Sequence, residues 1–318
     1  MVGYLLRRFL QAIIVVLGVV LIVFLLSRMI PGGEARAVLG PKATPLTIRE
    51  FNRVNGLTQP LWVQFWHYLI GLPQLKLGYS YKFTQPVWAV IQHRLPKTLV
   101  LVGTSVVLAL AIAIPLGVVQ VVRKGRASDY ALTGVAFVLY AMPAFFLGTL
   151  LIIWLSFDAR LLPVSPPSDA SPFAVWTDPK AFIMPVLTLA ALTIAAFSRY
   201  MRSSLLDAMA EDYIRTAKAK GASNRRVLYG HALRNALIPI ITLLGLSLPG
   251  IVSGAVIVES VFNYPGMGLL TVQAAENTDI PIVLGTTLVI TVATVIGSLL
   301  ADILYVLVDP RIRYGGSF

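Results

Sequence analysis

Six long stretches without a charged side chain constrain the fold of this chain more than any other feature. No Asp, Glu, Lys or Arg occurs in residues 9–27, 98–122, 130–157, 181–198, 235–258 or 280–301. A helix needs about 20 apolar residues to cross a hydrocarbon core about 30 Å thick, so each stretch is long enough for one span. Neighbouring helices can satisfy the backbone groups that a proline frees, so the prolines within these stretches are compatible with spans. They are Pro115, Pro143, Pro185 and Pro249.

The composition supports a membrane protein. Only 13% of the 318 residues are charged and 57% are hydrophobic, whereas a typical soluble domain has about 25% charged residues. We therefore predict an all-α, polytopic membrane protein in which residues 1–318 form one transmembrane domain. The six predicted spans cover about residues 9–30, 98–122, 129–157, 181–203, 235–259 and 280–307. Two segments have room for structure of their own, namely an external cap at 31–97 and a loop on the opposite side at 204–234.

The basic residues are distributed by membrane side. Eight Lys or Arg lie between Arg199 and Arg234, and Arg7, Arg8, Arg123, Lys124, Arg126, Arg311 and Arg313 fall on the same predicted side. The short loops on the other side are poorer in basic residues, with Arg160 and Lys180 in one of them and none from Glu259 to Ile280 in the other. This positive-inside bias predicts that both termini are cytoplasmic. The net charge of +12 therefore reflects topology and does not indicate a nucleic-acid partner.

The start of the chain resembles a signal peptide in one respect, because Arg7 and Arg8 precede an apolar stretch. A secretory apolar region typically has about 7–15 residues, and this one has about twenty, so we expect an uncleaved first span. The chain has no cysteine, which excludes disulfides and cysteine-ligated metals.

The sequence offers no catalytic group inside the predicted spans. The only histidines are His67, His93 and His231, all outside the spans, and the metal motif HExxH does not occur. Buried carboxylates typical of proton pathways are also missing from the span interiors, which disfavours a stand-alone secondary transporter. No GxxxxGK[ST] loop is present, so the chain does not bind ATP by that route. We expect no catalytic residue, metal or cofactor in this chain, and any energy must come from another polypeptide.

The external segment contains two short helical patterns, TPLTIREFNRV and QPLWVQFWHYLIGL. The second pattern is rich in aromatic residues, which are Trp62, Phe65, Trp66 and Tyr68. One interpretation is an interfacial helix in the aromatic belt of the membrane. The alternative is a cap that covers the mouth of a pathway or contacts an external partner.

The loop at 204–234 has a helix-turn-helix pattern. From Leu205 to Lys220 apolar residues recur at helical spacing on one face, and Glu211 and Arg215 form a favourable i,i+4 pair on the other. Gly221 is a natural helix stop. Ser223 is then placed to cap a second short helix, with Ala222 and Val227 as a hydrophobic staple.

Two arginines in the second helix are poorly placed for helix stability. Arg225 and Arg226 fall in its first turn, where cations meet the positive end of the helix dipole at a cost of about 0.3–1 kcal/mol each. Lipid head groups or a docked protein would explain them, and a solvated basic face is the alternative.

The fifth span, GLSLPGIVSGAVIVES, is the best candidate for a pathway. Its hydroxyls, small residues and bend-forming proline would suit a polar path, and Glu259 lies at its end. Ordinary packing of small residues between helices explains the same pattern. The candidate pathway residues are Ser247, Pro249, Gly250, Ser253 and Glu259.

Several of these segments together resemble one family. The stretch RTAKAKGASNRRVLYGHALRNALIP resembles the cytoplasmic loop of ABC-importer permeases of the dipeptide and oligopeptide type. The resemblance extends nearly end to end, through YLLRRFLQAIIVVLGV, GLTQPLWVQF, RLPKTLVLV, MPAFFLGTLL, VIVESVFNYPGMGLL and DPRIRYG. The chain is thus similar to the first permease subunit of a peptide importer, with the type I importer permease fold.

The general importer loop has the pattern EAA, three residues, Gly, nine residues, then I-x-L-P. Ala217, Gly221 and Leu233 match its second Ala, its Gly and its Leu. Arg215, Thr216, His231 and Arg234 stand where the pattern has Glu, Ala, Ile and Pro, which puts individual contacts in doubt but not the role of the loop.

The resemblance implies that this loop docks on a cytosolic ATPase subunit and couples its closure to the spans. The residues implied are Glu211, Asp212, Arg215, Thr216, Ala217, Lys218, Ala219, Lys220, Gly221, Ala222, Ser223, Arg225 and Arg226. It also implies a bacterial plasma membrane, a second homologous permease and two ATPase subunits that bind ATP and magnesium. An external binding protein would deliver the peptide. Nickel or glutathione is an alternative substrate for the same machinery, and a stand-alone channel or secondary transporter is a rival from another class.

Overall fold

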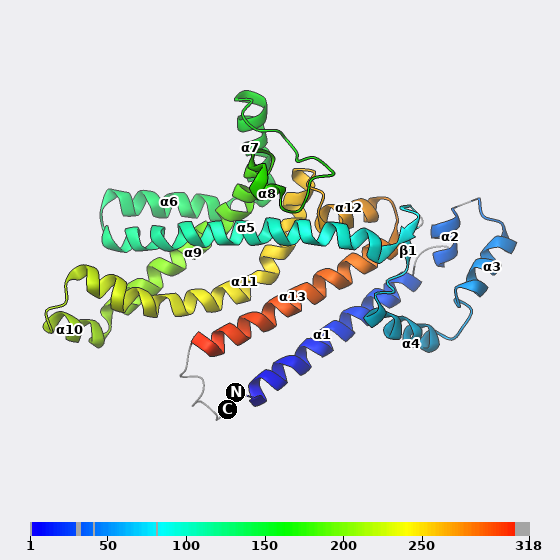
Figure 1. Ribbon diagram of the computed structural model, residues 1–318, viewed down its shortest axis with the longest axis horizontal. Coiled ribbons are helices and arrows are strands. Elements are labelled where there is room, and N and C mark those ends of the chain that lie inside the picture. Colours follow the sequence, from blue (N-terminus) through cyan, green and yellow to red (C-terminus); the bar gives the residue numbers. More distant parts are fainter. Residues whose placement is uncertain (1, 30–32, 41, 81, 309–318) are drawn as a thin grey trace.

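The computed structural model describes residues 2–29, 33–40, 42–80 and 82–308, so the terminal DPRIRYG motif lies outside the described residues (Figure 1). Five helices in this part of the chain contain stretches long and apolar enough to cross a membrane. Four of them are α1 (Val2–Arg28), α5 (Val87–Val122), α9 (Ile183–Ala210) and α13 (Ile280–Val308). The fifth runs from the π-helix Arg226–Ala232 into α11 (Leu233–Val261). The all-α prediction is confirmed, and these helices correspond to spans one, two, four, five and six.

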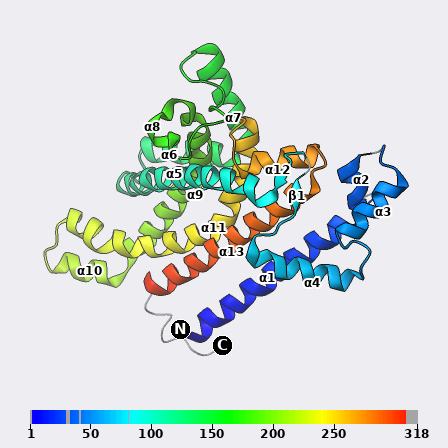
Figure 2. The same ribbon diagram turned by 45° about the vertical axis from the view of Figure 1, so that its right-hand side comes forward.

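The long helices pack into one bundle. Helix α5 packs along α9, α11 packs against both α9 and α13, and α1 packs on α13. In Figures 1 and 2 the short helix α10 (Asp212–Ala219) lies at one end of the bundle, and α2 to α4 lie at the other. The bundle therefore separates the two non-spanning segments that the sequence predicts.

The third predicted span is not one straight helix. Helices α6 (Ala127–Ala141) and α7 (Ala144–Leu151), with the π-helix Ile152–Asp158, pass the length and composition test together but bend by 106°. Met142 is extended at φ −80° and ψ 127°, because the ring of Pro143 disfavours helical geometry in the residue before it. Pro115 and Pro185 lie inside continuous helices. The chain therefore passes Pro115 and Pro185 without a break, whereas Pro143 divides the third predicted span into two helices that together still have the length and composition of one span.

Helix α5 begins at Val87, eleven residues before the predicted start of the second span at Thr98. The segment 31–97 therefore contains the first turns of α5 as well as the cap. The cap consists of α2 (Gly33–Leu39), α3 (Pro45–Val54), α4 (Leu61–Gly71) and the 3₁₀ turn Leu72–Gln74. Helices α3 and α4 match the two helical patterns that the sequence predicts.

A small hairpin joins the cap to the bundle. Strands β1 (Tyr79–Ser80) and β2 (Gln85–Pro86) pair antiparallel, with Tyr79 opposite Pro86. The buried Ser80 hydroxyl donates a hydrogen bond to Asp279 Oδ2 at 2.5 Å, just before α13. The hairpin is thereby fixed to the start of the sixth span.

Three short elements complete the described chain. Helix α8 (Ala174–Thr177) and the 3₁₀ turn Pro179–Ala181 lead from the bent third span into α9. Helix α12 (Met267–Glu276) lies between α11 and α13 and packs on both.

Candidate functional site

The loop between spans four and five begins with a break that the sequence pattern hides. Helix α9 ends at Ala210, Glu211 is extended at ψ 150°, and α10 starts at Asp212. The predicted continuous helix from Leu205 to Lys220 is therefore wrong. The ion pair also differs, because Arg215 Nη1 lies 3.4 Å from Asp212 Oδ1, and Glu211 is outside the helix.

The predicted stop at Gly221 is confirmed. Its φ is +81°, a left-handed conformation that costs a residue with a Cβ about 1–2 kcal/mol. The Gly221 amide donates to the Lys218 carbonyl at 2.9 Å, and the Ala222 amide donates to the Ala217 carbonyl at 3.1 Å. These two bonds form a Schellman motif, which satisfies the last carbonyls of α10.

The second helix of the predicted pair begins as expected but does not end where predicted. The Ser223 hydroxyl accepts a hydrogen bond from the Arg226 amide at 3.4 Å, as a helix cap does. A π-helix then runs from Arg226 to Ala232 and continues into α11 without a break. The prediction of a short separate helix is wrong, because the second element of the pair is the start of the fifth span.

Helix α10 lies with its apolar side against the bundle. Ile214 is 1% exposed and Ala217 is 8% exposed, and both belong to one hydrophobic cluster with Leu205, Val227 and Ala236. The adjacent Tyr213, although aromatic, is 36% exposed. The break at Glu211 rotates α10 relative to α9, so the two helices do not share one continuous face.

The remaining predicted coupling residues form an exposed polar surface. The side chains of Asp212 and Arg215 are 94% and 80% exposed. Ala222 is partly buried, and the other members are exposed: Glu211, Thr216, Lys218, Ala219, Lys220, Gly221, Ser223, Arg225 and Arg226. We call these exposed residues, together with Asp212 and Arg215, the α10 surface. The exposed Tyr229 beside it is an addition that sequence reasoning missed.

The backbone of the α10 surface is held in place by contacts within the chain. Its backbone is fixed by the Schellman motif and by the buried Ile214 and Ala217. The predicted coupling residues are thus brought together, with Ala217 as an internal anchor and most of the others outside.

A second site lies at the far end of α11, where Glu259 is completely buried. Its Oε1 accepts a hydrogen bond from the Thr98 hydroxyl of α5 at 2.6 Å. Its Oε2 accepts from the amides of Gly268 at 2.6 Å and Leu269 at 3.1 Å, in the first turn of α12. A carboxylate is favourable at the positive end of a helix dipole. We call Glu259, Thr98 and the first turn of α12 the α5–α11–α12 junction.

The rest of this junction is also hydrogen-bonded. Thr98 Oγ1 accepts from the Met267 amide at 2.8 Å, and the Tyr264 hydroxyl donates to the Lys97 carbonyl at 2.8 Å. Burial, and then the Glu259 carboxylate, raises the pKa of the Tyr264 phenol well above its usual range, so this hydroxyl remains a donor. Sequence reasoning found Glu259 but missed Thr98, which lies 161 residues away in the chain.

Two glycines let the junction close. A Cβ on Gly266 would overlap the Glu259 carboxylate, and a Cβ on Gly268 would overlap the Cα of Val256. The spacing of these glycines in NYPGMG is therefore the sequence signal for a close approach between α11 and α12.

The candidate pathway residues are only partly described. Ser247 is partly buried in α11. The structure describes Pro249, Gly250 and Ser253 as helical and does not describe their burial. Glu259 is enclosed by the junction, which gives it a positioning role in this conformation. A pathway role for these residues stays a prediction.

The four aromatic residues of α4 divide into two pairs. Phe65 and Tyr68 pack on Phe24 of α1, with ring centroids 5.3 and 6.0 Å apart. Trp62 and Trp66 are 75% and 58% exposed. Helix α4 thus joins the first span on one side and presents two indoles on the other.

No group of three or more His, Asp or Glu side chains that could hold a metal is found among the described residues.

Comparison with known proteins identifies the family. The binding-protein-dependent transport system inner membrane component family matches residues 109–314, and the N-terminal family of such membrane components matches residues 1–102. The chain belongs to this permease family.

Relatives match over their full length. The chain is 38% identical to the oligopeptide transport system permease protein AppB of Bacillus subtilis, over 99% of this chain and 100% of AppB. It is 34% identical to the dipeptide transport system permease protein DppB of Escherichia coli, over 99% of each chain. It is 37% identical to the glutathione transport system permease protein GsiC of Salmonella typhimurium, over 99% of this chain and 100% of GsiC.

A solved structure supports the fold assignment. The MetNI methionine ABC transporter, in inward-facing conformations, aligns with a TM-score of 0.52 at 16% identity. The alignment covers 67% of this permease and 93% of the MetNI chain. The permease therefore has the fold of an ABC importer membrane subunit, as the sequence predicts.

Proposed function

We propose that this permease carries peptides through the plasma membrane by alternating access, driven by two separate ATPase subunits that dock on the α10 surface. The observation that carries the proposal is the division of α10 into a face buried on the bundle and an exposed polar face. A helix anchored in this way can transmit the movement of a bound partner to α9 and α11, because its apolar side chains are packed among theirs.

The proposed assembly has four kinds of protein component in the lipid bilayer or beside it, and this permease is one of them. A second, homologous permease completes the pathway, and an external binding protein delivers the substrate. The ATPase subunits bind ATP and magnesium, so this chain needs neither a cofactor nor a catalytic residue. Both termini are cytoplasmic in this arrangement, in keeping with the basic residues of the loops at 123–126 and 204–234.

Charge reversal on the α10 surface tests the coupling. Arg215→Glu and Arg226→Glu change exposed side chains, so the fold is retained. In the full complex in liposomes, we expect each to lower substrate uptake and stimulated ATP hydrolysis about tenfold, as loss of an interface contact worth about 1.4 kcal/mol would. Arg123→Glu is the matched control, because Arg123 is exposed and directly follows α5. The loop between α5 and α6 lies at the same end of the bundle as α10 (Figure 1). Parental rates in both α10 variants would refute the docking role.

The relatives support a peptide substrate, with glutathione as the second candidate. Two of the relatives described above are peptide permeases, and GsiC is a glutathione permease of similar identity. Uptake of labelled di- and oligopeptides and of glutathione by the same complex separates the two. We expect saturable peptide uptake that excess glutathione leaves unchanged, and the reverse competition would favour glutathione.

A further inference from the structure

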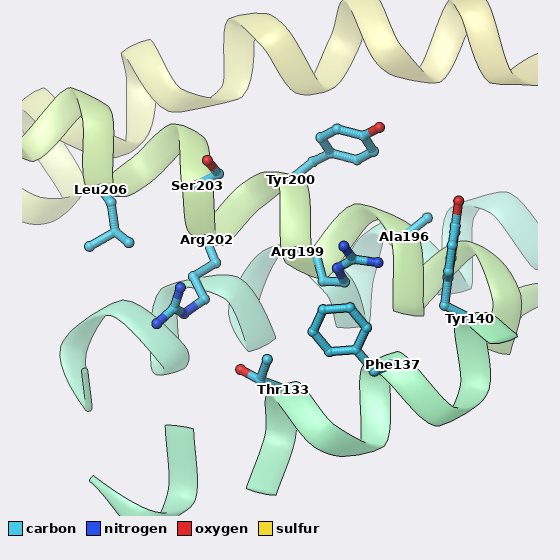
Figure 3. Close-up of a pocket in the computed structure, with 9 residues that line it drawn as sticks. All are labelled: Thr133, Phe137, Tyr140, Ala196, Arg199, Tyr200, Arg202, Ser203 and Leu206. Carbon is cyan, nitrogen blue, oxygen red and sulfur yellow. The ribbon is translucent and has the colours of Figure 1, made fainter. Parts of the chain in front are cut away.

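A pocket of about 440 Å³ lies between α6 and α9 (Figure 3), and no residue of the α10 surface or of the α5–α11–α12 junction lines it. Helix α6 contributes Thr133, Phe137 and Tyr140 to its lining, and α9 contributes the other side chains, among them two arginines. None of the candidate pathway or coupling residues lines this pocket, so its chemistry calls for a separate explanation.

The two arginines of the pocket have different surroundings. Arg202 forms a two-point ion pair with Asp129, with Nε and Nη2 at 3.1 and 3.0 Å from the carboxylate oxygens. The Arg199 guanidinium instead lies over the Phe137 ring, 4.1 Å from its centroid, and 5.2 Å from the centroid of Tyr140. Within the described ranges no carboxylate lies within ion-pair distance of Arg199. The pocket therefore holds one positive charge that α6 and α9 do not neutralise.

The remaining lining suits an anion. Four hydroxyl-bearing residues line the same pocket, namely Thr133, Tyr140, Tyr200 and Ser203. The Thr133 hydroxyl already accepts a hydrogen bond from the Gln120 side-chain amide at 3.3 Å, whereas the Tyr140 ring lies beside Arg199. A planar guanidinium held on an aromatic ring keeps its N–H groups in a fixed fork, which matches the oxygens of a phosphate. Stacking on Phe137 thus orients Arg199 before any ligand binds.

The position of Arg199 along α9 places the pocket at a membrane surface. The charge-free stretch 181–198 ends immediately before Arg199, and its 18 residues span about 27 Å at the rise of an α-helix, close to the thickness of a hydrocarbon core. The loop that precedes α6 carries the exposed Arg123, Lys124 and Arg126 at the same end. Basic pockets between spans on the cytoplasmic side bind anionic lipid head groups.

The surface beside the pocket is suited to acyl chains. On α6, Val135 and Val138 are 59% and 60% exposed, and Phe137 is 51% exposed. A lipid phosphate at Arg199 would leave its chains free to lie along these side chains. A free peptide carboxylate has no such need for an adjoining apolar surface.

We propose that the α6–α9 pocket binds the phosphate of an anionic phospholipid, with Arg199 as the principal contact and the Tyr140 hydroxyl as a supporting donor. The bound lipid covers the exposed side of α6 and joins it to α9. Its head group faces the side of the membrane that the proposed topology makes cytoplasmic. The proposal concerns lipid and not the transported substrate, so it can fail while the proposed transport function holds, and the reverse.

Native mass spectrometry of the assembled complex tests this. The complex is purified in mild detergent, incubated with phosphatidylglycerol or with phosphatidylcholine as a zwitterionic comparison, and the retained lipids are counted. We expect retention of phosphatidylglycerol in preference to phosphatidylcholine, and about fivefold weaker retention in Arg199→Gln. Tyr140→Phe, which removes one hydroxyl and keeps the ring, should weaken retention by a smaller factor.

Controls separate this pocket from general surface attraction. Arg123→Gln removes a basic residue of the neighbouring loop and should leave retention near the parental value. Equal loss in Arg123→Gln and Arg199→Gln would overturn the proposal, because it would mean diffuse attraction to the basic surface. Displacement of the bound lipid by excess inorganic phosphate or by a dipeptide would also overturn it, because the pocket would then be a site for free anions or for substrate. If Arg199→Gln fails to assemble, Tyr140→Phe carries the test.

Discussion

The Thr98 hydroxyl donates a hydrogen bond of 2.6 Å to the carboxylate of Glu259, and both residues are buried. This contact joins the second and fifth spans at the point where α12 begins. Because Thr98 also accepts from the Met267 amide, one hydroxyl and one carboxylate together fix three helices.

We expect Glu259→Ala to destabilise the permease by about 3 kcal/mol, because it leaves the Gly268 and Leu269 amides without their charged acceptor. Glu259→Gln keeps one acceptor oxygen and should cost less. Thermal unfolding of the purified chain, followed by tryptophan fluorescence, measures both. A melting temperature of Glu259→Ala equal to that of the parent would contradict a structural role for the carboxylate.

The glycine in the first turn of α12 provides an independent test of the same junction. We expect Gly268→Ala to cost about 1–3 kcal/mol, because the added methyl would overlap the Val256 backbone. Gly103→Ala in α5 is the matched control, since a methyl group added there has no neighbour within 4 Å. A gain in helix propensity should leave that variant as stable as the parent or slightly more stable. Equal melting of the two variants would mean that α12 shifts to accept the methyl.

A substitution at Gly221 tests the effect of backbone conformation alone, without a steric clash. Its φ is +81° and no atom lies within 4 Å of a Cβ at this position. Gly221→Ala should therefore loosen the end of α10 by about 1 kcal/mol, and hydrogen exchange in α10 should rise about fivefold. Gly221→Asn should have a smaller effect, because Asn tolerates the left-handed region better. Unchanged exchange in Gly221→Ala would show that the turn can form with φ below zero.

The two aromatic pairs of α4 should respond differently to truncation. Phe65→Ala removes the contact with Phe24, so we expect a loss of about 1–2 kcal/mol in stability. Trp62→Ala changes an exposed side chain and should alter stability by less than about 0.5 kcal/mol. If the cap meets the external binding protein, Trp62→Ala weakens that association in a surface-binding assay with the reconstituted complex. The reverse pattern of stability effects would mean that the exposed indoles are buried in the working complex.

Local features of this fold could be predicted from sequence because each depends on neighbouring residues. The charge-free stretches predict the spans. Gly221 predicts the end of α10, because few other residues adopt its left-handed backbone conformation, and Ser223 predicts the start of the next helix, because its hydroxyl can cap it. The bend at Met142 follows from Pro143, but α5 continues through Pro115, so a proline alone does not specify which span is divided. The break at Glu211 is concealed because Leu205 to Lys220 keeps helical periodicity across it.

Contacts between distant residues could not be predicted. The pairing of Glu259 with Thr98 depends on how α5 and α11 pack, and nothing in either segment alone specifies the partner. The stacking of Arg199 on Phe137 is of the same kind, since it requires that α6 and α9 lie side by side. Ionisable residues near span ends are therefore recognisable from sequence as important, but their partners are not.

The π-helix and α11 together form one uninterrupted rod from Arg226 to Val261. One end carries an exposed arginine of the α10 surface, and the other end carries Glu259. Each residue of an α-helix turns the chain by about 100°, so the angular phase between these two ends is set by the number of residues that separate them. Inserting or deleting one residue between Leu233 and Glu259 would therefore rotate Glu259 away from Thr98 relative to the Arg226 end, although both end residues would be retained. The number of residues in this rod therefore determines the relative orientation of its two ends, just as the side chains determine the contacts made there.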